Sequence, residues 1–150
     1  MKFNGIIENK LRLLEQKLGE IRSWKIKNYS EFSKSSLLYN AVERALQVSV
    51  EIMIDIAERI LALNNQPPAP SSSKAVEKLV DLEILPNADN FIDMVRFRNF
   101  IVHRYEYIDK EILFSIITKK LHHFDEFIDY IRSYNWNENK DERLKSKDKS

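Results

Sequence analysis

Residues 37 to 63 form the longest helical pattern in the chain, because apolar side chains cover most of a helical circumference with no glycine or proline between them. At about 1.5 Å per residue, a helix of this length spans roughly 40 Å, the full length of a small domain. A helix that is apolar on most sides must be surrounded by other elements, so this one is the expected centre of the fold. The whole sequence has only 2 glycines and 4 prolines, which favours long helices over a turn-rich sheet.

Four further segments show apolar residues at steps of three and four, as expected of helices packed around this centre. They cover about residues 7–24, 74–82, 87–103 and 109–134. We therefore predict an all-α, up-and-down bundle of about five helices in residues 1–134, followed by a polar tail at 135–150. No internal repeat or second core suggests another domain.

The connections between these helices are read from polar residues and prolines. Pro67, Pro68 and Pro70 mark a loop after the central helix. The polar stretch 25–36 carries four serines, any of which could cap the central helix, and Asp109 is the expected cap of the last helix.

The composition sets limits on function. A net charge of +1 means that any contact with nucleic acid must be local rather than spread over a basic surface. Cysteine is absent, which excludes disulfides, thiolate metal sites and cysteine nucleophiles. No apolar run approaches the roughly 18 residues needed to span a bilayer, and no signal peptide is seen, so we expect no membrane contact and a cytoplasmic location.

One stretch breaks the helical pattern that surrounds it. Arg98 falls on the apolar face of the segment 87–103, where a guanidinium must find an anion, a hydrogen-bond acceptor or solvent because arginine does not lose its proton. His103 follows five residues later, and histidine is the side chain most often used for proton transfer near neutral pH. No acidic residue lies between Asp93 and Glu106. The stretch is thus a candidate site for a phosphate group beside an imidazole.

Helical geometry constrains how this site can work. Five residues turn a helix by roughly 500°, so Arg98 and His103 lie about 140° apart around the axis. For both to reach one phosphate, either the helix must end by His103 or a second subunit must supply the missing group. A two-fold dimer would meet this need, because the same patch of both chains faces one groove.

The string Arg98-Asn99, followed by His103-x-Tyr105 and then Ile108-Asp109, resembles the signature of the HEPN domain in its HepT toxin form, over about residues 5–132. The resemblance implies a small helical homodimer that cleaves transfer or messenger RNA without a metal ion or cofactor. It also implies a partner antitoxin, a nucleotidyltransferase of the MNT type that adds AMP to the motif tyrosine.

The same resemblance assigns roles to individual residues. Arg98 and His103 are the expected catalytic pair, and Asn99 and Tyr105 support them, with Tyr105 as the AMP acceptor. Arg96 and Arg104 are expected to contact RNA, since exposed cations near a phosphate path attract the backbone. RNA carries its own nucleophile, the 2′-hydroxyl, so the expected products are a 2′,3′-cyclic phosphate and a 5′-hydroxyl.

Other interpretations use the same residues. The chain could be a noncatalytic helical subunit of a two-component nucleotidyltransferase, in which Arg98 and His103 grasp a nucleotide. It could also be a bundle in which they have only packing roles, with Asn99 as a helix cap. On the central helix, Glu43 and Arg44 could orient the site or simply face solvent.

His122 and His123 fall within an otherwise regular helix. Because adjacent residues do not share a helical face, we expect surface positions for them rather than metal ligation.

Overall fold

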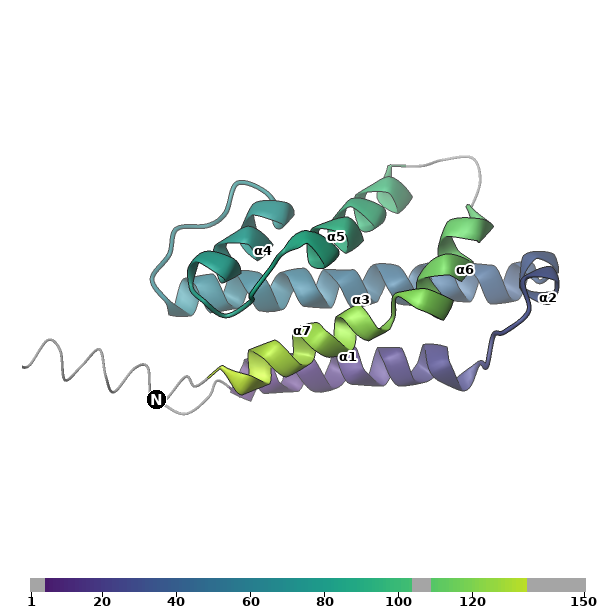
Figure 1. The fold of residues 1–150 in the computed structure, drawn as a ribbon, viewed down its shortest axis with the longest axis horizontal. Coiled ribbons are helices and arrows are strands. Elements are labelled where there is room, and N and C mark those ends of the chain that lie inside the picture. The colour runs from purple at the N-terminus through teal and green to yellow at the C-terminus, as the bar shows by residue number, and fades with distance from the viewer. Residues whose placement is uncertain (1–4, 104–108, 135–150) are drawn as a thin grey trace, which may run out of the picture.

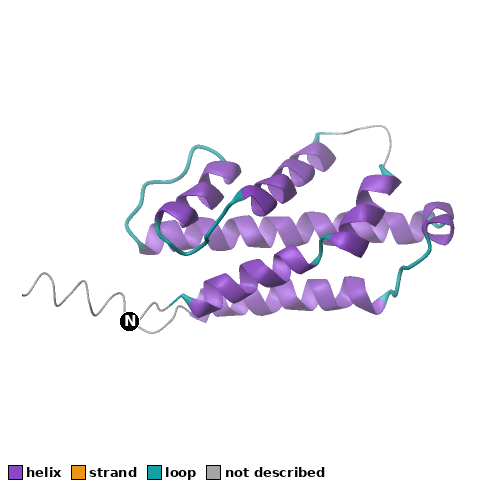
Figure 2. Ribbon diagram, in the orientation of Figure 1, coloured by secondary structure: helices purple, strands orange, loops and turns teal. Residues whose placement is uncertain are grey.

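The structure, a computed structural model, describes residues 5–103 and 109–134. Every regular element in these two ranges is a helix and none is a strand (Figure 2). In chain order the helices are α1 (Gly5–Ser23), α2 (Tyr29–Lys34), α3 (Ser36–Leu63), α4 (Ser72–Asp81), α5 (Asp89–Val102), α6 (Lys110–Lys119) and α7 (His122–Ser133). The predicted all-α bundle is confirmed, with seven described helices in place of about five.

Helix α3 is the axis of the molecule. It has 28 residues and runs along the whole bundle in Figure 1, with α4 and α5 on one side and α1 and α7 on the other. Its buried residues cover about 200° of the helical circumference, while Arg44, Glu51 and Glu58 are exposed on the remaining side, and α1 adds a regular stripe from Ile7 to Ile21. None of the described helices is long and apolar enough to cross a membrane.

Side-chain caps fix where several helices begin. The Ser35 hydroxyl accepts a hydrogen bond from the Leu38 amide at 3.2 Å, which identifies the serine that starts the central helix. The Asp109 carboxylate accepts one from the Ile112 amide at 3.0 Å, as predicted. Asn28 caps α2 in the same way, through the amide of Glu31.

Two local predictions differ from the structure. The stretch 25–36, expected as a polar connection, contains the short helix α2, which is anchored in the core by the fully buried Phe32. The last predicted helix is two helices, since the chain breaks at Lys120 and Leu121 between α6 and α7. Apolar residues keep helical spacing across this break, because Leu121 itself is buried, so periodicity does not reveal it.

Ion pairs hold α7 against α1. Arg132 donates to Glu8 at 2.8 Å and to Glu15 at 2.7 Å, and Arg22 donates to Asp125 at 3.2 Å near the other end of α7. The hydrogen bond from Arg132 lowers the pKa of Glu15 below its usual value of 4.5. These pairs fix the direction in which α7 leaves the break after α6.

Replacing Arg132 with alanine should weaken this contact. We expect Arg132→Ala to lower the free energy of unfolding by about 1 kcal/mol or less, because the partners are partly exposed to solvent. Since the lowered pKa of Glu15 stabilises the fold only while the carboxyl is charged, the difference from wild type should be largest above pH 4.5 and shrink as the pH falls through the folded-state pKa.

Thermal denaturation at neutral and acidic pH measures this effect. Arg59→Ala is the matched control, because Arg59 pairs at 3.6 Å only with Asp55 on its own helix. A deficit for Arg132→Ala that is equal at pH 7 and pH 3 would show that the ion pairs are not its source.

Candidate functional site

The candidate site lies at the end of α5. The helix stops at Val102, and His103 is its C-terminal cap, with its backbone amide donating to the Asn99 carbonyl oxygen at 3.1 Å. The helix therefore ends by His103, which is one of the two arrangements considered from the sequence. The Asn99 carbonyl holds that last turn, and the described residues show no hydrogen bond from the Asn99 side chain.

Arg98 occupies the apolar side of α5, as predicted. It projects from the same side as the buried Phe91 and Val95 and is itself half-buried. Its Nη2 atom donates to the hydroxyl of Ser72 at 3.2 Å, in the first turn of α4. The Nε atom is buried and has no hydrogen-bond partner within residues 5–103 and 109–134. A buried N–H group without an acceptor costs about 1–3 kcal/mol, so this position of Arg98 does not by itself favour the stability of the fold.

His103 lies on a different side of the same helix. Measured from Arg98 around the axis of α5, ideal helical geometry places His103 at about 140°, Arg96 at about 160° and Asn99 at about 100°. All three of these residues are exposed. Ending the helix at His103 does not remove the separation, because the turns that lead up to it are helical. No hydrogen bond joins Arg98 to His103 in the described part of the chain.

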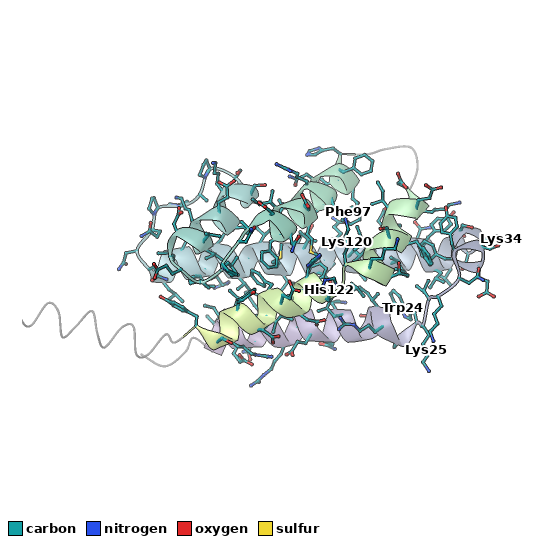
Figure 3. The ribbon with its side chains drawn as sticks, in the orientation of Figure 1. Trp24, Lys25, Lys34, Phe97, Lys120 and His122 are labelled. Atoms are coloured by element: carbon teal, nitrogen blue, oxygen red, sulfur yellow. The ribbon has the colours of Figure 1, made fainter. Side chains whose placement is uncertain are left out.

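A cleft of about 460 Å³ lies beside the exposed side of α5, between that helix, α6 and the start of α7. Its walls are largely apolar, and its volume is in the range of small-ligand sites. Figure 3 shows Phe97 of α5 and Lys120, at the break after α6, near the middle of the molecule. The residues that line the cleft are Asn90, Asp93, Met94, Arg96, Phe97, Phe100, Ile112, Ser115, Ile116, Lys120 and His123.

The cleft brings together basic side chains that lie far apart in the sequence. Arg96, predicted to contact RNA, lines it together with Lys120 and His123 from the region where α6 ends and α7 begins. These residues are about 25 positions apart, and no sequence motif links them. Arg104 and Tyr105, the other predicted site residues, lie outside the described residues.

His122 and His123 differ from their prediction. They do not lie inside a regular helix but in the first turn of α7, directly after the break. His122 is exposed, but His123 is mostly covered, and both approach the carboxylate of Glu126. The exposed position of His122 agrees with the expectation of a surface residue, whereas His123 is more covered than expected.

Comparisons with known proteins agree with this architecture. The family model described as "Ribonuclease HepT-like" matches residues 11–131. An mRNA nuclease HepT of Shewanella oneidensis is 31% identical over 133 residues, which cover 87% of this chain and 98% of that protein.

Solved structures show the same fold. The tri-AMPylated HEPN toxin of Shewanella oneidensis, in complex with its MNT antitoxin, superposes with a TM-score of 0.79 at 28% identity, covering 87% of this chain and 99% of that one. A cytosolic Bacillus subtilis protein of unknown function gives a TM-score of 0.73 at 21% identity, covering 85% of this chain and 87% of that one, and shows likeness of fold alone.

If the role of Arg98 is to bind an anion rather than to stabilise the fold, the fold should tolerate an apolar residue at this position. We expect Arg98→Met to leave the free energy of unfolding unchanged or to raise it by about 1 kcal/mol, because it removes the buried Nε without an acceptor.

Urea denaturation measures this change. Arg96→Met, at an exposed position on the same helix, is the matched control and should have an effect near zero. A loss of more than about 1 kcal/mol in Arg98→Met alone would mean that the bond to Ser72 supports the fold.

Proposed function

This chain belongs to the HepT-like ribonuclease family, and we propose that it is a toxin that cleaves RNA without a metal ion, through Arg98 and His103. The observation that carries the proposal is the half-buried guanidinium of Arg98, whose Nε has no acceptor in the described chain, together with an exposed imidazole at the end of the same helix. Arginine that is poorly solvated and incompletely bonded is well suited to an anionic phosphate.

The chemistry needs only proton transfer and charge stabilisation. The 2′-hydroxyl of the RNA attacks phosphorus, a bond from O2′ to phosphorus forms, and the bond from phosphorus to O5′ breaks. His103 as general base takes the proton of the 2′-hydroxyl, and the resulting imidazolium returns a proton, through water, to O5′ as it leaves. Arg98 stabilises the charge on the phosphorane. The products are a 2′,3′-cyclic phosphate and a 5′-hydroxyl, and DNA is not cut because it lacks the 2′-hydroxyl.

A dimer would bring Arg98 and His103 to the same phosphate, which a single α5 helix does not do. Because Arg98 and His103 lie about 140° apart on α5, a two-fold axis beside the end of that helix would place both pairs around one groove. Phe100 and Val102, at the same end of α5, are 48% and 42% exposed and offer apolar surface for such a contact. Each of the two symmetry-related sites in the groove would then take Arg98 from one subunit and His103 from the other.

Positive charge beside the motif supports RNA as the substrate. Arg96 and Lys120 line the cleft next to α5, where they would contact phosphates, and Asp93, 3.7 Å from Arg96, lines it as well. Arg104 is proposed to add a further phosphate contact. Since the net charge of the chain is only +1, binding depends on this local group of cations.

The proposed antitoxin is a nucleotidyltransferase of the MNT type that adds AMP to Tyr105. Support comes from the solved HEPN toxin relative, which is AMPylated and bound to an MNT antitoxin. Tyr105 is two residues from His103 in the sequence, so an attached nucleotide would bring a phosphate and an adenosine close to the catalytic imidazole.

Cleavage of purified messenger and transfer RNA in excess chelator tests the function. We expect wild-type protein to produce cyclic phosphate ends, and His103→Ala and Arg98→Ala to lower the rate by about 10²- to 10⁴-fold. Arg59→Ala, on α3 and outside the cleft, is the control that should retain activity.

The same assay distinguishes the proposed toxin function from the alternative function, that of a noncatalytic subunit that binds nucleotide. The nuclease proposal would be rejected by two results together. RNA would remain intact with both wild type and His103→Ala, and Tyr105 would remain unmodified after incubation with the antitoxin and ATP. Cleavage by wild type that requires an added metal ion would reject the metal-independent mechanism.

A further inference from the structure

A second group of reactive side chains, which we call the α7 histidine cluster, consists of His122, His123 and Glu126. The Nε2 atom of His122 lies 3.9 Å from Oε1 of Glu126, and the Nδ1 atom of His123 lies 3.4 Å from Oε2 of the same residue. The two imidazole ring centroids are 4.1 Å apart. One ligand atom from each of the three residues fits within a mutual distance of 4.8 Å.

Helical geometry explains why these side chains meet. Around the axis of α7, His123 follows His122 by about 100°, and Glu126 returns to about 40°, between the two histidines and one turn further on. Spacings of three and four residues place side chains next to each other on a helix surface, so Glu126 is the natural partner of both. The break at Lys120 and Leu121 puts both histidines in the first turn, where no preceding helical turn covers them.

The three groups form a chemically coherent set of metal ligands. Two imidazole nitrogens and one carboxylate oxygen are a ligand combination used for zinc, which leaves a fourth position open to water. Zinc lies about 2.0–2.1 Å from each ligand, so ligand atoms in a tetrahedral site are roughly 3.3 Å apart. The contact of 3.4 Å is near this value already, and small rotations of the side chains would close the remaining distances.

The surroundings of the cluster predict which ions it accepts. The first turn of a helix carries partial positive charge, and Lys120 lies nearby on the wall of the cleft that His123 also lines. Both features oppose any divalent cation, so binding must come from the ligand atoms, and a single carboxylate supplies too few oxygen ligands for Mg²⁺ or Ca²⁺. Imidazole nitrogen instead favours ions of the later transition series. The side chain of His122 is 58% exposed, so an ion can enter from solvent.

We propose that His122, His123 and Glu126 bind one divalent transition metal ion of the zinc class, at the start of α7 and beside the cleft. The site is separate from Arg98 and His103 and has no part in the proposed cleavage of RNA. Its occupation would tie the first turn of α7 to a residue one turn later and would fix the position of His123 on the cleft wall.

Titration of the untagged protein with Zn²⁺, followed by calorimetry, tests the proposal without RNA. We expect one equivalent of Zn²⁺ per chain, no saturable binding of Mg²⁺, and an affinity for Zn²⁺ that falls about tenfold or more in His122→Ala, His123→Ala and Glu126→Gln. His103→Ala is the matched control, since it removes the third histidine of the chain and leaves the cluster intact. Circular dichroism would verify that each variant is folded.

Substitution with Co²⁺ gives a second readout. A visible absorption band typical of tetrahedral coordination should appear in wild type and His103→Ala and be lost in Glu126→Gln and His122→Ala. The proposal is overturned if wild type binds no stoichiometric Zn²⁺, if the three cluster variants bind as tightly as wild type, or if His103→Ala abolishes binding. None of these results bears on ribonuclease activity in chelator, so the two proposals fail independently.

Discussion

The site depends on the cost of placing a permanent positive charge on the apolar side of a helix. Arg98 does not lose its proton, and α5 directs it toward α4 rather than toward solvent, where Ser72 accepts one of its hydrogen bonds and Nε is left buried without an acceptor among the described residues. The long central helix makes this arrangement possible, because both α4 and α5 pack along α3 and are thereby held against each other. The fold thus keeps the guanidinium of Arg98 partly desolvated, and in the proposed function this would strengthen its interaction with a phosphate.

The second constraint is the angle that separates Arg98 from His103 around the axis of α5. A helix that presents Arg98 to the interior must present His103 to another side, and the end of α5 at Val102 leaves that separation in place. The end of the helix does provide an exposed imidazole at a terminus, on the same side of α5 as Arg96, where a second subunit and an RNA strand could both reach it. In the proposed dimer, a site made from two copies of α5 would reconcile a half-buried arginine with an exposed histidine, and it would explain how a chain with a net charge of +1 acts on RNA through a small, local group of cations.

Much of this arrangement was predictable because it depends on neighbours in sequence. The span of the central helix, the Asp109 cap and the position of Arg98 on a buried face all follow from local periodicity, and the spacing from Arg98 to Tyr105 identified the family. The break at Lys120 was not predictable, because Leu121 continues the apolar spacing through it. The cleft was also hidden, since Arg96 and Lys120 meet only when α5 packs beside the end of α6. The histidine cluster, in contrast, could have been found from the sequence, because Glu126 lies three and four residues after His123 and His122.

Complementation between inactive subunits tests the central claim most directly. Arg98→Ala and His103→Ala proteins would be unfolded together, refolded and assayed on RNA in excess chelator, with each variant refolded alone as control. If each site takes Arg98 from one chain and His103 from the other, half of the randomly mixed dimers carry one intact site of two, and activity should return to roughly a quarter of the wild-type rate. A mixture that forms dimers but remains as inactive as each variant alone would contradict a site shared between subunits.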